Sequence, residues 1–410
     1  MITIVGSGPA GFYAALTAAS LGEKVTVVEE RDKLGGTCVL FGCIPSKAML
    51  HPMALAYSLG RIGKTLNFSY LELTKLAKDA INRISKGIEY ALESHDIDVI
   101  HGKASLKGGK IEVNGQTLNS EKVIIATGTK KPSGALASDD LPYLDKDFNR
   151  VVIVGGGVGG VEYGWLLRMI GKEVHIVERE DLLLPKHDPD LRKSITNYFS
   201  KLGFKLHMGV EAKIEGNEVI TSKGEKIEGD FVLLSFGRKP NLEGFEELRS
   251  DKWLLVNEYM ETSLKNVYAA GDVTGSFTAH EAIHKGVTAA LNSVGKRKAY
   301  DGSVVPKVIY TMPQIAYIGK TTGNCKKIDM VTLPRAIAEK ETEGFLKICE
   351  EGGKIVGAVV FSERAEEIIT IIGIAMKFGI SISSLLDFQF PHPSYLESIW
   401  ELVRTFDGIM

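Results

Sequence analysis

Two cysteines separated by four residues, Cys38 and Cys43, are the residues of this sequence best suited to carry out chemistry. Thiols at this spacing can close a small disulfide ring. Pro45 fits the first turn of a helix, because its fixed φ suits that position and its missing N–H is not needed there. Cys43 is therefore expected at or just before a helix N-terminus, where the helix dipole and a nearby Lys lower a thiol pKa from about 8.5 toward roughly 3.5 to 7.5. We predict that Cys43 is the stable thiolate of the pair and that Lys47, one helical turn on, brings an ammonium near it.

A structural disulfide and half of a zinc site are the alternative interpretations of this pair. Four cysteines in 410 residues do not make the disulfide framework of a secreted protein. Zinc would require a second pair of ligands nearby, whereas Cys325 and Cys349 stand alone without ligand spacing. We therefore expect those two to be ordinary buried or half-buried thiols. No metal site is expected, and the Cys38/Cys43 pair is interpreted as redox-active.

The elements that must position this chemistry begin with a strand, glycine turn and helix at residues 2–22. The turn reads Gly6-x-Gly8-x-x-Gly11, and the following strand ends at Glu29. In such a turn the first Gly allows the tight bend, the second lets the backbone approach a pyrophosphate, and the third lets the helix pack on the strand. With strand, helix and terminal acid all in place, this unit is predicted to bind a dinucleotide.

The same pattern recurs at residues 151–171, where the turn reads Gly155-x-Gly157-x-x-Gly160 and the next strand ends at Glu178. Two such units predict two dinucleotides. A carboxylate in that place accepts both hydroxyls of an unmodified ribose and repels a 2′-phosphate, so Glu178 favours NAD over NADP. Arg179, the next residue, is the group that would oppose this preference.

Composition limits the remaining possibilities. Lys and Arg number 49 and Asp and Glu 51, a formal net charge of −2, so nothing suggests a nucleic-acid partner. Residues 2–5 run directly into the glycine turn, which predicts a core strand rather than a signal peptide. No run approaches the roughly 18 uninterrupted apolar residues of a membrane span. We expect a soluble, cytoplasmic protein without a membrane partner.

The segment from Gly35 to Lys47 resembles the active-site signature of the class I pyridine nucleotide-disulfide oxidoreductases, and its Ile-Pro-Ser-Lys ending is most like that of dihydrolipoyl dehydrogenases. The resemblance extends over nearly the whole chain, through residues 124–128, 236–241 and 268–272. It implies bound FAD and NAD. It also implies that Asp272 binds the ribityl chain of FAD. It implies further that Glu162 is the partner of Lys47, because burying the charge of Lys47 without a partner would be costly.

Residues 391–397, Pro-His-Pro-Ser-Tyr-Leu-Glu, resemble the family's His-Pro-Thr-x-Ser-Glu motif, with His392 and Glu397 at the family's spacing. An imidazole is a natural base for removing a proton from a dithiol, and a hydrogen-bonded carboxylate fixes its tautomer. His392 is thus the candidate base and Glu397 its orienting group. In the family this His reaches the disulfide of the opposite subunit, which implies a symmetric homodimer with a shared site.

These patterns predict an α/β protein with two Rossmann-like dinucleotide-binding domains followed, from about residue 305, by an α+β domain. With the resemblance, the FAD domain is expected at 1–147 and 268–303, the NAD domain at 148–267 and the dimerisation domain at 304–410. The expected catalytic residues are Cys38, Cys43, Lys47, Glu162, His392 and Glu397. The expected FAD contacts are Gly6, Gly8, Pro9, Ala10, Gly11, Glu29, Gly36, Thr37, Lys47, Ala104, Thr127, Gly128, Asp272 and Ala279. The expected NAD contacts are Gly155, Gly157, Val158, Gly159, Gly160, Glu178, Val210 and Gly237.

The resemblance therefore implies oxidation of dihydrolipoyl groups by NAD, with the substrate either free or carried by an acyltransferase subunit. Glutathione-type and mercuric reductases are the alternatives; Glu178 argues against the NADPH that they use, and residues 406–410 lack the C-terminal cysteine pair of mercuric reductases. A subunit of a 2-oxoacid dehydrogenase complex that only holds FAD is an alternative of another class, which the intact set of catalytic residues disfavours. Met312 replaces the His of the family's Tyr-Thr-His-Pro motif, a departure that bears on the interface and the shape of the lipoyl site.

Overall fold

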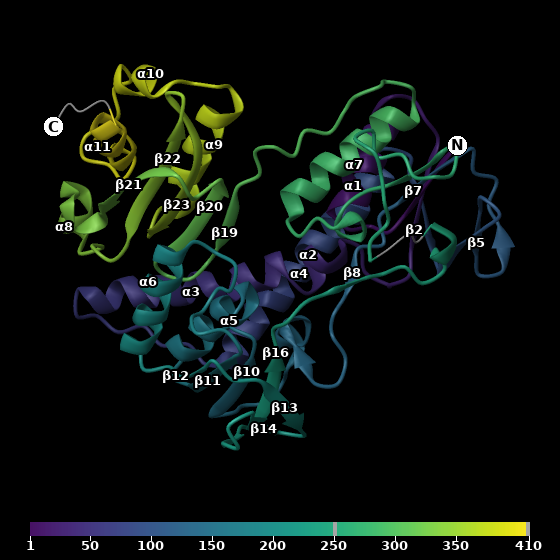
Figure 1. The fold of residues 1–410 in the computed structure, drawn as a ribbon. Helices are drawn as coiled ribbons and strands as arrows, with labels where there is room; N and C mark the ends of the chain where they lie inside the picture. Colours follow the sequence, from purple (N-terminus) through teal and green to yellow (C-terminus); the bar gives the residue numbers. More distant parts are fainter. Residues whose placement is uncertain (249–251, 407–410) are drawn as a thin grey trace. The chain divides into compact units, whose positions relative to one another are not determined.

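The computed structural model describes residues 1–248 and 252–406, which form two compact units (Figure 1). Unit 1 is assembled from residues 1–49, 71–145 and 237–302. Unit 2 is assembled from residues 50–70, residues 146–236 and the chain from residue 303 on. The protein is a mixed α/β protein, as its two strand-turn-helix repeats predict. Each unit is described by itself below.

Unit 1 contains the first glycine turn and the cysteine pair. Its elements are β1 (Ile2–Val5), α1 (Pro9–Ser20), β2 (Val25–Glu29), α2 (Gly36–Leu40), the first part of α3 (Cys43–Arg61), α4 (Tyr70–Glu93), β3 (Asp98–His101), β4 (Ala104–Lys107), β5 (Lys110–Val113), β6 (Gln116–Thr117), β7 (Lys122–Ile125), β8 (Thr129–Lys130), β9 (Leu136–Ala137), η1 (Ser138–Tyr143), β17 (Lys239–Pro240), η2 (Glu246–Leu248), β18 (Val267–Ala269), η3 (Asp272–Thr274) and α7 (Ala279–Ser293).

Five parallel strands form the main sheet of unit 1 in the order β18-β7-β1-β2-β3. β1 lies at its centre, with Ile2 opposite Val25 of β2 and opposite Lys122 of β7. Every residue of β1 and β2 is buried, as expected for parallel strands covered on both faces. β18 reaches the edge of this sheet from a part of the chain that follows the second glycine turn, so distant sequence completes the first nucleotide-binding unit.

Helices α1 and α7 pack against each other and lie side by side in Figure 1. Their backbones approach closely, because a Cβ atom at Gly286 of α7 would lie 2.2 Å from the carbonyl oxygen of Ala10 in α1. Ala14, Ala15 and Ala18 of α1 are fully buried in the core. Small side chains on α1 therefore allow the close packing that holds its N-terminus at the glycine turn.

Unit 2 contains the second glycine turn and the C-terminal sheet. Its elements, besides the end of α3, are β10 (Arg150–Val154), α5 (Val158–Met169), β11 (Glu173–Glu178), α6 (Pro189–Lys201), β12 (Lys205–Met208), β13 (Ala212–Glu215), β14 (Glu218–Thr221), β15 (Lys226–Glu228), β16 (Phe231–Leu234), β19 (Lys307–Ile309), β20 (Gln314–Gly319), β21 (Asn324–Asp329), η4 (Met330–Thr332), α8 (Pro334–Glu339), β22 (Phe345–Glu351), β23 (Lys354–Ser362), α9 (Ala365–Lys377), α10 (Ile382–Leu386) and α11 (Glu397–Phe406).

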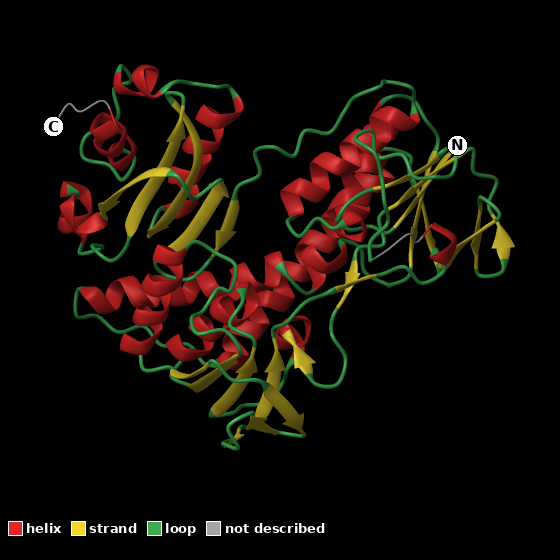
Figure 2. Cartoon of the chain, in the orientation of Figure 1, coloured by secondary structure: helices red, strands yellow, loops and turns green. Residues whose placement is uncertain are grey.

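Unit 2 contains a parallel sheet, a large antiparallel sheet and the small antiparallel sheet β13-β14-β15. Parallel strands β12, β11, β10 and β16 lie in that order around the second glycine turn. Antiparallel strands form the second sheet in the order β19-β20-β23-β22-β21, next to helices α9 and α11 (Figure 2). Ile318, Ile348 and Val360 share the face of this sheet that packs with Ile369 of α9 and Leu402 of α11. The region from about residue 305 is thus α+β in character, as its sequence predicts.

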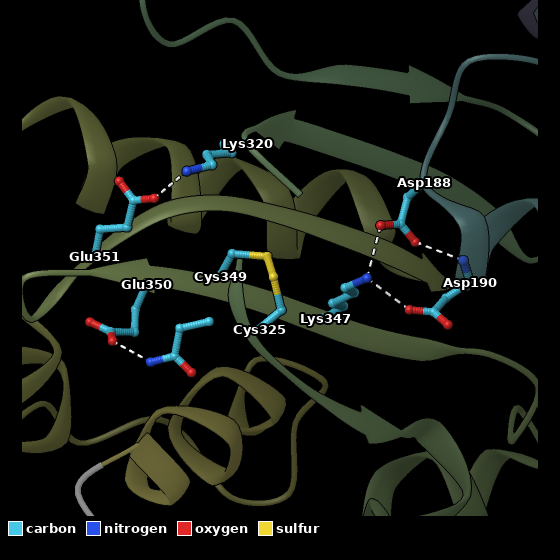
Figure 3. Close-up of a disulfide and its surroundings, with 9 residues drawn as sticks. Asp188, Asp190, Lys320, Cys325, Lys347, Cys349, Glu350 and Glu351 are labelled. Carbon is cyan, nitrogen blue, oxygen red and sulfur yellow. Dashed lines mark hydrogen bonds and ion pairs between the residues drawn. A yellow bond between two sulfur atoms is a disulfide. The ribbon is translucent and has the colours of Figure 1, made fainter. Parts of the chain in front are cut away.

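Cys325 and Cys349 form a disulfide (Figure 3), so the expectation of two ordinary thiols is wrong. They lie directly opposite each other on β21 and β22, with their Cα atoms 4.0 Å apart. The strand register brings together two residues that are 24 positions apart in sequence, and the sequence spacing alone does not reveal that register. On the same face, Lys347 Nζ pairs with Asp188 at 2.9 Å and with Asp190 at 2.7 Å (Figure 3).

The two units divide the chain differently from the domain bounds expected from sequence. Residues 237–267 pack in unit 1, whereas sequence patterns placed them with the NAD domain. The physical reason is that β17 pairs with β8 and that Phe245 and Leu254 enter the same core as Val5. Residues 50–70 belong to unit 2, where the ring of Tyr57 meets the ring of Trp165 at 6.0 Å.

One helical stretch among the described residues, 36–61, is long and apolar enough to cross a membrane by length and composition alone. The sequence contains no uninterrupted apolar run of that length, and this helical stretch meets the criterion through its mean hydropathy. Core helices of soluble proteins also meet this criterion, and these residues carry the cysteine pair. The stretch is therefore weak grounds for a membrane assignment.

Candidate active site

The cysteine pair occupies the short helix α2 and the start of α3. Cys43 is the first residue of α3, which confirms the helix start predicted from Pro45. Cys38 lies within α2, which the left-handed Gly35 (φ 115°) begins. Both sulfurs are free thiols in the structure, Cys43 the more exposed and Cys38 half-buried. The two thiols interact with each other through a hydrogen bond.

The surroundings of the two thiols bear on which one carries charge. The pKa of Cys38 is raised well above its ordinary value, because it hydrogen bonds to Cys43, is largely buried and faces the charge of Cys43. Lys47 opposes this increase and Asp272 adds to it. Cys38 therefore holds its proton more tightly than an ordinary thiol, whereas the assignment of the thiolate to Cys43 stays a prediction. The Lys47 ammonium donates a hydrogen bond to Ser46 Oγ at 3.2 Å.

Backbone surfaces suited to a pyrophosphate lie beside the pair. Gly36, at the start of α2, has a φ of +58°, and a Cβ there would lie 2.6 Å from the Cα of Gly8. A Cβ at Gly6 would lie 2.4 Å from the oxygen of Ala126, and one at Gly11 would lie 1.8 Å from the oxygen of Gly6. Side chains are thus excluded where a dinucleotide phosphate must approach the N-terminus of α1. This part of unit 1 fits FAD.

Glu29 lies at the end of β2, as predicted, and is 4% exposed. Its Oε2 accepts hydrogen bonds from the backbone N–H of Ser7 at 3.0 Å and from the Ser7 hydroxyl at 2.6 Å. The Ser7 hydroxyl in turn accepts one from the backbone N–H of Gly35 at 3.0 Å. Ser7 thus connects the glycine turn to the segment of the cysteines. Sequence reasoning missed it because it fills an unspecified position of the glycine motif.

Asp272 begins η3 and is largely buried, and burial raises the pKa of its carboxyl to about 6. Arg238 opposes that increase. The Arg238 guanidinium pairs with Asp139 at 2.5 Å and lies 3.5 Å from Thr37 Oγ1. A buried carboxyl of this kind suits binding to hydroxyl groups, which is the role implied for it toward FAD. Sequence reasoning missed Arg238, although it noted the surrounding motif.

The other expected FAD contacts also lie in unit 1. Pro9, Ala10 and Gly11 form the first turn of α1. Ala104 begins β4, and Ala279 begins α7. The remaining two are Thr127, whose hydroxyl donates to the carbonyl of Asn241 at 2.7 Å, and Gly128, which has a φ of +67°. Unit 1 thus contains the whole set, although the chain supplies it from two separate stretches of sequence, 6–128 and 272–279.

The second glycine turn repeats the geometry of the first. A Cβ at Gly155 would lie 2.6 Å from the oxygen of Ser235, and one at Gly160 would lie 2.1 Å from the oxygen of Gly155. Glu178 Oε2 accepts a hydrogen bond from the backbone N–H of Gly156 at 2.7 Å, as Glu29 does from Ser7. This part of unit 2 fits a second dinucleotide. Ser235, which the sequence did not single out, forms the wall opposite the turn.

The remaining expected NAD contacts divide between the units. Gly157 is the N-cap of α5, and Val158, Gly159 and Gly160 form its first turn. Val210 donates its backbone N–H to the carbonyl of Glu178 at 3.1 Å. Gly237 is the first residue of a stretch that belongs to unit 1. Its assignment to NAD stays a prediction.

Glu162 lies on α5 and is 8% exposed. Its Oε2 accepts a hydrogen bond from the backbone N–H of Tyr310 at 3.0 Å, within unit 2. Lys47 belongs to unit 1. The predicted pairing of Lys47 with Glu162 stays a prediction.

His392 and Glu397 form the hydrogen-bonded pair that their spacing predicts. The His392 Nδ1 and Glu397 Oε1 atoms are 2.7 Å apart, and Oε2 accepts the backbone N–H of Ser394 at 2.7 Å. Because a carboxylate only accepts hydrogen bonds, Nδ1 carries the proton and Nε2 is left as the basic nitrogen. The His392 side chain is 69% exposed and that of Glu397 is 19% exposed. This pair can accept a proton from a group that approaches from outside.

Comparison with known protein families matches two models to this chain. The model described as pyridine nucleotide-disulphide oxidoreductase matches residues 1–290. The model for the dimerisation domain of the same family matches residues 305–403. The cysteine pair and the first glycine turn fall within the first match, and His392 and Glu397 within the second.

The relatives similar to this chain include proteins named for two different activities. A mercuric reductase from Staphylococcus aureus is 32% identical, over 99% of this chain and 82% of that protein. A mitochondrial dihydrolipoyl dehydrogenase from Pisum sativum is 31% identical, over 99% of this chain and 91% of that protein. The crystal structure of LpdA from Mycobacterium tuberculosis has a TM-score of 0.89 at 27% identity and covers 99% of both chains.

Proposed function

Because the chain belongs to the pyridine nucleotide-disulphide oxidoreductase family, we propose that it is a dihydrolipoyl dehydrogenase that oxidises dihydrolipoyl dithiols with NAD. The family is one of flavoprotein disulfide oxidoreductases, which use FAD and a pyridine nucleotide. The observation that carries the proposal is the His392–Glu397 pair, 2.7 Å apart, because it supplies the base that a dithiol substrate requires.

The chemistry assigns one role to each residue. His392 Nε2 accepts a proton from a substrate thiol, and Glu397 holds the imidazole in the tautomer that leaves Nε2 basic. The substrate thiolate attacks Cys38 of the oxidised Cys38–Cys43 pair, and Cys43 leaves as the thiolate, whose charge its helix start stabilises. The second substrate thiol then displaces Cys38, which forms the substrate disulfide and leaves both cysteines reduced. Two electrons have passed from substrate to enzyme.

FAD and NAD supply the remaining hydride chemistry when bound, and the protein supplies placement and charge. Gly8 and Gly36 leave room for the FAD pyrophosphate, and Asp272 is placed to bind its ribityl hydroxyls. Glu178 supports NAD over NADP, because its carboxylate would repel a 2′-phosphate.

The proposal includes a homodimer in which His392 of one subunit serves the cysteines of the other. The match to the family's dimerisation domain supports the homodimer. It also includes a cytoplasmic location and a dihydrolipoyl substrate that is either free or attached to an acyltransferase subunit. An FAD-holding structural subunit is disfavoured, because such a role requires neither the thiol pair nor the base.

A second candidate is a mercuric reductase, because relatives of that name are as similar to this chain as the dihydrolipoyl dehydrogenases are. In the aligned relatives the chain spans 82% of a mercuric reductase and 91% to 98% of dihydrolipoyl dehydrogenases.

The deciding experiment compares three assays on one preparation of the holoenzyme. We expect NADH formation from dihydrolipoamide and NAD, with efficiency for NAD exceeding that for NADP by orders of magnitude. Oxidation of NADPH with glutathione disulfide, or with Hg²⁺ and excess thiol, serves as the comparison. Faster turnover with Hg²⁺ than with dihydrolipoamide would replace the first candidate by the second.

A further inference from the structure

The candidate base stands on an irregular segment. His392 lies between α10 and α11, in residues 387–396, which contain no helix or strand. Its side chain is 69% exposed, so neighbouring packing does little to hold it. A base must stay within hydrogen-bond reach of the proton that it removes. Something other than packing around His392 must therefore fix the segment.

Tyr395 is the residue that anchors this segment in the interior. It is 6% exposed and belongs to the core of the antiparallel sheet. Its hydroxyl donates a hydrogen bond to Glu341 Oε2 at 2.5 Å and lies 3.3 Å from Glu339 Oε2. Its carbonyl accepts a hydrogen bond from the buried hydroxyl of Ser398 at 2.6 Å. The residue three positions from the base is thus bound at both its backbone and its side chain.

The carboxylate that receives the Tyr395 hydroxyl is itself held by Arg61. Glu341 Oε1 lies 3.5 Å from the Arg61 guanidinium, whose other nitrogen pairs with Glu363. The Glu341, Arg61 and Glu363 side chains are 11%, 15% and 2% exposed. The guanidinium also lies 4.7 Å from the ring centre of Tyr57. Arg61 is the last residue of α3, where a cation is favoured by the helix dipole.

The charges make this arrangement rigid. One guanidinium serves two carboxylates away from water, so removing Arg61 leaves two buried carboxylates without their cation. Burial raises the pKa of Glu363 to about 7 although Arg61 opposes the increase, and the nearby Glu341 charge adds to it. The guanidinium donates a hydrogen bond to Glu363 through Nη2, and its Nη1 faces Glu341 at ion-pair distance. Ends of α3, α8 and β23 are thereby tied to the segment of the base.

We propose that Tyr395 is a positioning residue for His392, held in place through Glu341 by the Arg61–Glu363 ion pair. The inference rests on the proposed function only in assigning the role of base to His392. The chain Tyr395, Glu341, Arg61, Glu363 sets where the His392–Glu397 pair stands. The family motif leaves the position of Tyr395 unspecified.

The first test is Tyr395→Phe, which keeps the ring in the core and removes only the hydroxyl. We expect kcat for dihydrolipoamide oxidation to fall roughly 10- to 100-fold, which is less than the rate lost when a positioned base is removed entirely. KM and the reduction of bound FAD by NADH should stay unchanged. Glu341→Gln keeps an acceptor for Tyr395 and removes the ion pair, so its loss should be smaller. Arg61→Lys keeps the charge without the fork and should restore only part of the activity that Arg61→Met loses.

The matched control is Tyr317→Phe, which removes another largely buried hydroxyl in unit 2, one that lies 3.1 Å from His187. It should leave kcat unchanged. A second readout is the downfield proton resonance of the His392 Nδ1–H hydrogen bond to Glu397, assigned by its loss in His392→Ala. Tyr395→Phe should weaken or abolish this resonance in the holoenzyme, whereas Tyr317→Phe should preserve it.

Two outcomes separate this inference from the proposed function. If the wild-type enzyme does not oxidise dihydrolipoamide but Tyr395→Phe loses the resonance, the substrate assignment fails and the positioning role stands. If Tyr395→Phe keeps both the resonance and full kcat while its melting temperature falls, Tyr395 is only a structural residue and the inference is overturned. If Tyr395→Phe does not fold, kcat and the His392–Glu397 proton resonance are measured in Glu341→Gln instead, and unchanged values of both overturn the inference.

Discussion

At the scale of single residues, Cys38 and Cys43 are two thiols whose different surroundings favour different protonation states. The pKa of Cys38 is raised by its hydrogen bond to Cys43, by burial and by the neighbouring charge, with Lys47 opposing. Cys43 occupies the first position of a helix, where partial positive charge favours an anion. The two sulfurs are therefore suited to different steps, Cys38 to exchange with a substrate and Cys43 to hold charge.

The division of roles predicts a spectral difference between two serine variants. Cys38→Ser leaves the Cys43 thiolate beside oxidised FAD, so the purified holoenzyme should show a long-wavelength absorption band without prior reduction. Cys43→Ser, its matched control, should show none. A band in Cys43→Ser and none in Cys38→Ser would exchange the two assignments.

The raised pKa of Glu363 predicts how the free energy of unfolding depends on pH. Its pKa is raised from an ordinary 4.5 to about 7 in the folded protein. The stability it contributes is therefore fully present below about pH 4.5 and is lost as pH rises through about 7. Relative to wild type, Glu363→Gln should gain about 3 kcal/mol in unfolding free energy over this range, measured by denaturant unfolding. Glu367→Gln, an exposed control, should change little with pH. A constant difference between Glu363→Gln and wild type would contradict the raised pKa.

At the scale of elements, the sequence predicted those features that depend on local pattern. Two glycine motifs with their strands and terminal acids identified β1 to β2 and β10 to β11, and Pro45 identified the start of α3. Features that depend on register or on distant packing could not be predicted this way. Cys325 meets Cys349 only through the pairing of β21 with β22. Arg61 meets Glu341 only because the end of α3 packs in unit 2.

The cross-strand disulfide predicts a reductant-sensitive stability in the C-terminal sheet. Closing a loop of 24 residues in the unfolded chain stabilises the folded state by about 3 kcal/mol. The double variant Cys325→Ala, Cys349→Ala should lose about this amount of unfolding free energy. Wild type with reductant should lose this amount beyond any change that reductant causes in the double variant, which keeps only the Cys38/Cys43 pair. Reactive thiols at Cys325 and Cys349 in the denatured, unreduced protein, identified by alkylation and peptide mapping, would show that the bond does not form.

At the scale of the whole molecule, the site is proposed to be shared between two chains. His392→Ala should fold and bind FAD but lose roughly 10²- to 10⁴-fold in dithiol oxidation, the worth of a positioned base. Mixed with Cys43→Ser through denaturation and refolding, it should restore roughly a quarter of wild-type activity, since half of the dimers are mixed and each has one intact site. Well-refolded mixed dimers without activity would place His392 in the site of its own subunit, and a fully active His392→Ala homodimer would place it outside catalysis.

The discontinuous assembly of unit 1 has a consequence for the chain during its synthesis. Cys43 leaves the ribosome about 220 residues before β18, the strand that completes the sheet beside β7. At roughly 5–20 residues per second this interval lasts roughly 10–45 s. From the synthesis of β7 until that of β18, β7 presents an unpaired edge, and the two closely spaced thiols lie on a nucleotide-binding unit that is not yet closed. The nascent chain is thus exposed to mispairing and premature oxidation while the ribosome translates the whole stretch between β7 and β18, which includes the second glycine turn.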